Sequence, residues 1–172
     1  IDNQDYKDLI INSKEKNERK KVCFKNGSIM LMKKSLMKKV NYFDDKYFLY
    51  FEESDYYKRC MDINLPIYIH NKVIIKHEGG AAIEKELRGE YQKIRNWHYC
   101  WSKFYYYKKH YGYLTGLSKT TPNLIRAIKS VAHGLFTFNF EKVLIHYVEI
   151  EGLFCSYFNI KSFYRIKNKK LL

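Results

Sequence analysis

Residues 47–59 have the sequence YFLYFEESDYYKR, in which an aromatic run leads directly into acids and then into a helical pattern. Apolar residues follow at 56, 57, 60 and 61, with the i, i+4 spacing of a helix. Pro66 ends this predicted helix because proline cannot continue it. Three acids stand in its first turn, where the helix dipole favours negative charge: Glu52, Glu53 and Asp55.

Strand-like pieces lie on both sides of this helix. Residues 22–32 are apolar around the turn-forming trio Asn26-Gly27-Ser28, which predicts a strand, a tight turn and then a strand or helix. Residues 1–21 indicate a loop or short helix, and residues 33–40 a short helix. Residues 67–77 read as two short β pieces that lead into His77-Glu78-Gly79-Gly80. The pattern predicts a mixed α/β part that extends to about residue 82.

From residue 83 to 172 the pattern is helical. Apolar residues from Leu87 to Tyr105 step by three and four along a long helix that stops near Gly112. Thr121-Pro122 fits the start of a second helix, and a third runs from about Phe140 to Tyr157. We therefore expect two parts, 1–82 and 83–172, the second packing on the first.

Composition limits the partners and the compartment. The 172 residues carry 32 Lys and Arg against 18 Asp and Glu, a net charge of +14 that attracts phosphates or anionic membranes. Nucleotide bias of an AT-rich genome is the alternative source of the lysines. The four cysteines form no Cys-x-x-Cys pair, and no apolar run is long enough to span a bilayer. The chain opens on Ile1, so we expect natural sequence upstream of it.

The acids of residues 52–55 are the first candidates for chemistry. Such a cluster can bind a metal or supply a general base, and the aromatic side chains before it would raise the pKa of a carboxylate by desolvation. Helix capping is the structural alternative. His77, at a strand end before two glycines, is a candidate metal ligand, although a lone histidine is more often simply packed.

Basic side chains provide the second candidates. Arg88 and Arg95 stand seven residues apart on one helix face and could clamp a diphosphate, with salt bridges to Glu84 or Glu90 as the competing use. The aromatic and basic stretch 97–113 could stack the bases of a single-stranded nucleic acid. A core stripe with a solvated basic face is the interpretation that we favour for it.

Taken in order, these segments resemble the C-terminal half of family-2 inverting glycosyltransferases, especially bacterial rhamnosyltransferase-like enzymes that build polysaccharides. Residues 24–32 look like the strand and glycine turn beside the acceptor, and residues 42–50 resemble the segment Gly-Phe-Asp-Glu-x-Phe-Phe-x-Tyr. Residues 51–59 are similar to the motif Glu-Asp-x-Asp-x-x-x-Arg, and residues 73–80 to the strand before His-x-Gly-Gly. Residues 88–110 resemble the helix with Tyr-x-x-x-Arg-Asn and a later Lys-His.

This resemblance implies an α/β fold, the C-terminal part of a GT-A type nucleotide-diphospho-sugar transferase fold followed by helices. It implies direct displacement at the anomeric carbon, with Glu53 at the position of the usual base. That position is Asp in the family, so Asp55 and Glu52 stay open as the working group. Asn26 and Gly27 match the acceptor-facing turn, and His77 matches a histidine that can complete the metal site.

The resemblance also implies partners. The donor would be a nucleotide-diphosphate sugar and the acceptor a glycan or a lipid-linked glycan. The Asp-x-Asp motif of the family is missing here in a fitting context, so Mg²⁺ or Mn²⁺ and most of the nucleotide would be held by a preceding half of the protein. We expect a cytoplasmic protein, with the Pro122 helix as a candidate for peripheral attachment to an anionic membrane at the inner face.

Two alternatives to an active transferase stay open. One is a non-catalytic glycosyltransferase-like partner subunit. The other is a basic module that binds single-stranded nucleic acid through residues 97–113, although we expect no nucleic-acid partner. Salt-dependent binding to single strands would distinguish the second alternative from the first.

Overall fold

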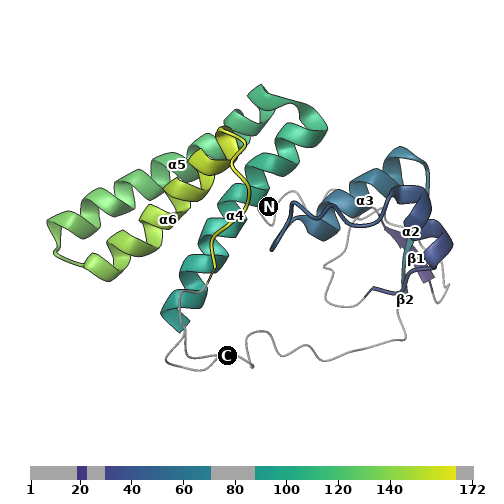
Figure 1. Ribbon diagram of the computed structural model, residues 1–172, viewed down its shortest axis with the longest axis horizontal. Helices are drawn as coiled ribbons and strands as arrows, with labels where there is room; N and C mark the ends of the chain where they lie inside the picture. The colour runs from purple at the N-terminus through teal and green to yellow at the C-terminus, as the bar shows by residue number, and fades with distance from the viewer. Residues whose placement is uncertain (1–18, 23–29, 71–87, 166–172) are drawn as a thin grey trace. The chain divides into compact units, whose positions relative to one another are not determined.

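The structure, a computed structural model, describes residues 19–22, 30–70 and 88–165 (Figure 1). These ranges contain five helices and two short strands. In chain order the elements are β1 (Arg19–Val22), α2 (Lys34–Val40), α3 (Glu52–Asp62), β2 (Ile67–His70), α4 (Arg88–Tyr111), α5 (Tyr113–Phe136) and α6 (Phe140–Tyr157).

The chain divides into two compact units. The first consists of residues 1–44 and 52–79, and the second of residues 45–51 and 80–172. The boundary that the sequence predicts, after residue 82, lies outside the described residues.

The first unit holds a small sheet and two helices. β1 and β2 pair antiparallel, with Arg19 opposite His70 and Val22 opposite Ile67. α2 and α3 bury aromatic and aliphatic side chains in a core of their own. That core contains Val40, Tyr56, Tyr57 and Cys60, with Met30, Met32, Leu65 and Ile67 packed at its edge.

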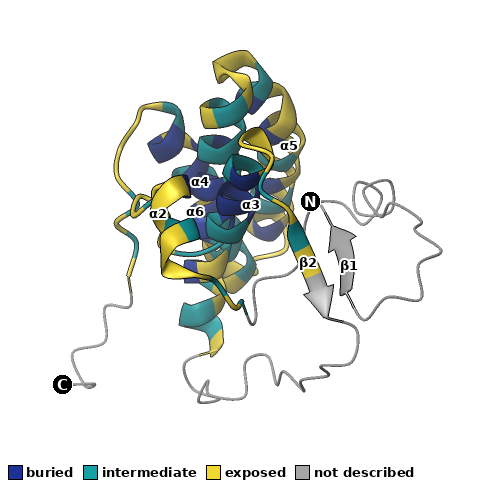
Figure 2. Cartoon of the chain, turned by 90° about the vertical axis from the view of Figure 1, so that its right-hand side faces the viewer, coloured by how far each residue is buried: buried dark blue, intermediate teal, exposed yellow. Residues whose placement is uncertain are grey.

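The second unit is built from α4, α5 and α6, which bury their facing sides against one another (Figure 2). Trp97, Phe104 and Leu153 are fully buried at its centre. Residues 45–51 also belong to this unit, and the carbonyl oxygen of Leu49 accepts a hydrogen bond of 2.9 Å from Ser102 of α4. The prediction for α4 is confirmed in part: Ile94, His98 and Trp101 of the predicted stripe are buried, whereas Trp97 and Phe104 lie outside that stripe.

The prediction of an α/β GT-A type fold is wrong. Most of the described residues are helical, and the described strands form one two-stranded antiparallel sheet in place of a mostly parallel one. The physical reason is that a short apolar run indicates only a local preference for extended backbone. A strand of a larger sheet also needs neighbouring strands with which its backbone can form hydrogen bonds. Helical periodicity needs no distant partner, and it decides the structure of residues 88–157.

Two boundaries also differ from the predictions. β1 begins at Arg19, within the segment expected to be a loop or short helix. α5 begins at Tyr113, so Pro122 lies inside a helix instead of starting one. Proline offers no N–H to the preceding turn, a defect that costs about 3 kcal/mol in a helix interior. Burial of Gly116 and Ala127 on either side of the proline holds both halves of the helix in the bundle.

The predictions for the other helices are confirmed. A short helix occupies Lys34–Val40, the acids stand in the first turn of α3, and α4 ends at Tyr111, next to Gly112. Three of the cysteines, Cys60, Cys100 and Cys155, are buried free thiols. Burial raises the pKa of each, that of Cys100 to about 12, so these cysteines act as small apolar core residues.

Candidate active site

The chain enters α3 through a strained aromatic turn. Tyr50 and Phe51 have φ angles of 67° and 68°, in the left-handed region that bulky residues rarely adopt. Each such residue costs on the order of 1 kcal/mol and persists only where its surroundings enforce it. Phe51 is buried against Tyr99 and Tyr106 of α4, in the same unit. The acids of the first turn of α3 follow this turn directly in the chain.

Glu52 and Glu53 each carry a buried carboxylate oxygen, Oε2, that has no hydrogen-bond partner among the described residues. Burial raises the pKa of Glu52. A backbone hydrogen bond opposes this, and the negative charge of Glu53 and a side-chain hydrogen bond with it raise the pKa further. A carboxylate that water and neighbours do not satisfy binds a proton more tightly and is therefore a stronger base.

Asp55 has a different role. Its side chain is fully buried, and its Oδ2 accepts a hydrogen bond of 2.8 Å from Nε of Arg59, with Nη2 of the same arginine also 2.8 Å away. Arg59 also donates to the carbonyl oxygen of Val40, at the end of α2. Asp55 is thus one partner of an ion pair that ties α3 to α2. Of the three acids that the sequence left open, only Glu52 and Glu53 keep an unsatisfied oxygen.

The raised pKa of Glu52 predicts a stability effect. The usual pKa of this carboxyl is 4.5, and its pKa in the folded chain is higher. At pH values between the two, Glu52 therefore binds a proton when the chain folds. The stabilisation from this proton is complete below pH 4.5 and is lost as the pH rises through the folded pKa. Glu52→Gln should therefore raise the thermal midpoint at neutral pH and have little effect below pH 4.5. Thermal unfolding of both proteins at the two pH values measures this; an equal shift at both would contradict it.

The acids Glu52 and Glu53 belong to the first unit, whereas Arg88 and Arg95 belong to the second. Arg88 is exposed at the first residue of α4, and Arg95 is exposed with its Nε donating to the hydroxyl of Tyr50 over 2.7 Å. Sequence analysis offered a salt bridge to Glu90 as the competing use of these arginines. Glu90 instead pairs with Lys93, at 2.6 Å. Asn26, Gly27 and His77 lie outside the described residues.

One buried carboxylate in the second unit, that of Glu149, was not predicted from the sequence. Glu149 is 5 % exposed and accepts hydrogen bonds from Asn96 of α4 and Arg126 of α5, both at 2.8 Å. Nδ1 of His146 is 3.2 Å from it. This one carboxylate therefore connects all three helices of the bundle. The periodicity of α6 gave no signal for it, because large apolar residues of that pattern, Phe140, Tyr147 and Phe154, are exposed and the buried face carries Glu149.

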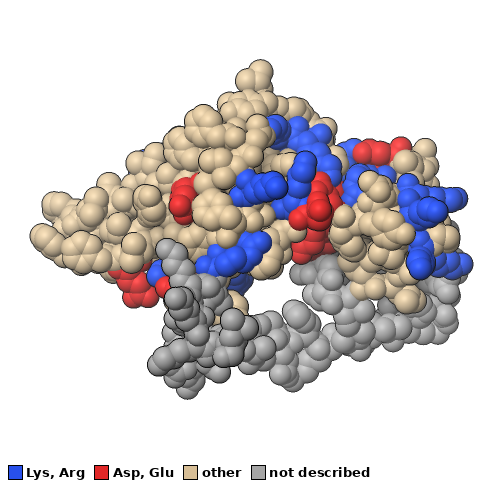
Figure 3. Space-filling view, viewed as in Figure 1, with Lys and Arg blue, Asp and Glu red and all other residues tan. Residues whose placement is uncertain are grey.

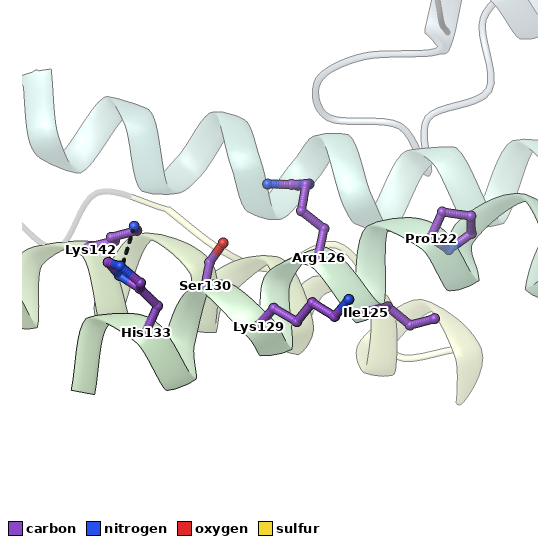
Figure 4. A pocket seen from close by; sticks show the side chains of 7 residues that line it. All are labelled: Pro122, Ile125, Arg126, Lys129, Ser130, His133 and Lys142. Atoms are coloured by element: carbon purple, nitrogen blue, oxygen red, sulfur yellow. Dashed lines mark hydrogen bonds between the residues drawn. The ribbon is translucent and has the colours of Figure 1, made fainter. Parts of the chain in front are cut away.

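A shallow hollow of about 680 Å³ lies beside α5 and α6 (Figure 4). Basic side chains line much of it: Arg126, Lys129, His133 and Lys142. Nζ of Lys142 is 3.3 Å from Nδ1 of His133, whereas the guanidinium of Arg126 is paired with Glu149. Pro122, which also lines the hollow, belongs to the helix that the sequence indicates as a candidate for membrane attachment.

The aromatic stretch 97–113 is largely core. Trp97, Trp101 and Phe104 are at most 4 % exposed, so their rings cannot stack on bases while the bundle is folded. Tyr111 and Tyr113, at the end of the stretch, are exposed. The core interpretation of the sequence is confirmed for the residues on the buried face of α4.

The described residues contain no group of three or more His, Cys, Asp or Glu side chains placed to hold a metal ion. Asp55, one of the candidate donors in α3, is taken by Arg59. Comparison with protein-family models, with curated proteins and with solved structures finds no match for this chain.

Proposed function

We propose that this chain is the acceptor and catalytic-base part of an inverting glycosyltransferase that moves a sugar from a nucleotide-diphosphate donor to a glycan or lipid-linked glycan. The observation that carries the proposal is the pair Glu52 and Glu53, each with a buried, unpartnered carboxylate oxygen. The pair occupies the position that resembles the base-bearing motif of family-2 enzymes. Support therefore comes from motif and local chemistry, and does not require the α/β fold that the structure contradicts.

The chemistry assigned to α3 is removal of one proton. An acceptor hydroxyl gives its proton to the carboxylate as its oxygen attacks the anomeric carbon, and the bond to the donor diphosphate breaks on the opposite side with inversion. Glu53 is the first choice for the base by position in the motif, and Glu52 stands beside it with a raised pKa. Asp55 and Arg59 have a structural role, because their ion pair holds the first turn of α3 in place.

The remaining parts of the reaction are assigned to residues outside α3. The family resemblance assigns Mg²⁺ or Mn²⁺ and the nucleotide to a preceding half of the protein, with His77 as a contributor. Arg88 and Arg95, both exposed on α4, are proposed to contact the diphosphate. The proton transfer assigned to Glu52 and Glu53 does not involve the metal ion.

The proposed location is the cytoplasm, with peripheral attachment at the inner face of the plasma membrane. None of the helices that the structure describes is both long and apolar enough to cross a bilayer.

Transfer by the full-length protein tests the proposed function. Purified protein would be incubated with a panel of nucleotide-diphosphate sugars, lipid-linked acceptors and either Mg²⁺ or Mn²⁺, and the release of nucleoside diphosphate and labelled product would be followed. We expect acceptor-dependent release with one donor and inverted stereochemistry in the product. A folded protein that transfers no sugar from any donor would favour the non-catalytic partner subunit.

A further inference from the structure

The turn between α5 and α6 exposes a cluster of large apolar side chains. Phe136 is 86 % exposed, Phe138 79 %, Phe140 62 % and Leu135 53 %; we call these four residues the hairpin tip. From residue 130 to 140 the chain contains no Lys, Arg, Asp or Glu. Figure 3 shows this end of the molecule, at the left, as an almost uncharged surface.

The turn that holds the tip is fixed by close backbone contacts. The N–H of Thr137 and that of Asn139 donate to the carbonyl oxygens of His133 and Gly134, at 3.0 and 2.8 Å. The side chain of Asn139 caps α6 by accepting from the N–H of Lys142. Gly134 allows the two helices to approach, since a Cβ there would lie 2.8 Å from Cγ2 of Val143. The phenylalanines thus project from a rigid turn.

Phe138 is held against its backbone preference. Its φ angle is 53°, a conformation that glycine or asparagine adopts at much lower cost than an aromatic residue. Its side chain is 79 % exposed, so packing within the described residues does not compensate for the strain. A strained and solvent-exposed phenylalanine is typical of a residue that makes a functional contact.

Basic side chains follow the tip along the hairpin. Lys142 comes two residues after Phe140, and Lys129 precedes Phe136 by seven residues, about 10 Å along the helix axis at 1.5 Å per residue. His133 lies between them beside Lys142. Glu141 is the only acid from residue 130 to 148, and the whole chain carries a net charge of +14. Basic side chains therefore lie within about 10 Å of the apolar tip, a distance that matches the depth of lipid headgroups.

We propose that the hairpin tip inserts into the interface of an anionic lipid bilayer. An apolar face buried about 5–10 Å at the boundary between headgroups and acyl chains would accommodate the four tip residues. The same depth would place Lys142, His133 and Lys129 beside the lipid phosphates, where each lysine strengthens binding about fivefold. The proposal extends the proposed location but is independent of sugar transfer, because vesicle binding needs neither donor nor acceptor.

Co-sedimentation of the full chain with vesicles tests the proposal. Vesicles of phosphatidylcholine alone would be compared with vesicles of equal parts phosphatidylcholine and phosphatidylglycerol. The tip variant carries Phe136→Gln and Phe138→Asn, and the matched control carries Leu114→Gln and Phe158→Asn, which replace residues 79 % and 71 % exposed outside the tip. We expect the tip variant to lose at least about tenfold in partitioning to the anionic vesicles, and the control to bind like the unchanged chain.

Three results would overturn the proposal. The first is a tip variant that binds anionic vesicles as well as the unchanged chain does. The second is equal binding of the unchanged chain to both vesicle compositions, because the basic side chains would then contribute nothing. The third is a chain that binds neither kind of vesicle but changes from dimer to monomer in the tip variant, which would make the tip a contact between two copies.

Lys129→Gln with Lys142→Gln should weaken anionic binding about fivefold for each charge removed.

Discussion

Replacing Glu53 with glutamine in the full-length protein is expected to lower kcat for sugar transfer by about 10²- to 10⁴-fold, the contribution of a positioned general base. Glutamine preserves the size of the side chain but cannot take a proton from the acceptor hydroxyl. KM should change little, because the interaction lost is one made in the transition state. Initial rates over a range of acceptor concentrations give both constants.

Two further variants make this result specific. Glu52→Gln shows which carboxylate is the base, because the variant with the larger loss in kcat identifies it. Asp62→Asn removes an exposed acid from the last turn of the same helix and should leave kcat unchanged. If neither Glu52→Gln nor Glu53→Gln lowers kcat while the protein transfers sugar normally, the assignment of the base to α3 is wrong.

Replacing Gly152 with alanine is expected to destabilise the helical unit by about 3 kcal/mol or more. A Cβ at this position would lie 2.5 Å from the carbonyl oxygen of Trp97 and 3.2 Å from its carbonyl carbon. Both atoms belong to the backbone of α4, so the contact cannot be relieved by rotating a side chain, and α6 must move away. Overpacking of this kind costs about 1–3 kcal/mol even where side chains can adjust.

The thermal midpoint of the second unit measures the effect. Both tryptophans of the chain, Trp97 and Trp101, are in the core of this unit, so their fluorescence reports its unfolding. A loss of 3 kcal/mol corresponds to a fall of about 12–24 °C for a unit of this size. Gly89→Ala is the matched control, because a Cβ there meets nothing within 4 Å. Equal midpoints for the two variants would mean that α4 and α6 do not approach as closely as described.

Local signals in the sequence were sufficient for the helices. The spacing of apolar residues from 87 to 105 predicted α4, and the position of the acids predicted the first turn of α3. These predictions hold because helical hydrogen bonds are made within the segment, so its own residues carry the information. The same principle failed at Pro122, where packing of α5 outweighs the local cost of a proline.

The carboxylates show what spacing cannot resolve. Spacing alone does not distinguish Glu52, Glu53 and Asp55, since all three stand in one turn of a helix; the family resemblance put Glu53 first and left the other two open. The structure separates them by what each contacts: Asp55 is paired with Arg59, whereas Glu52 and Glu53 retain a buried oxygen without a partner among the residues described. The Arg59 pairing was detectable from its i, i+4 position relative to Asp55, but the burial of that pair was not.

The sequence by itself determined the helices α3, α4 and α6, part of the buried stripe of α4 and the acids at the start of α3. Only the tertiary structure decided the fold class, the role of each acid, the burial of Glu149 and the exposure of the hairpin tip. The physical reason is the range of the interactions. Helix periodicity and capping act within a few residues, whereas sheet pairing, ion-pair burial and surface exposure depend on residues tens of positions apart in the chain.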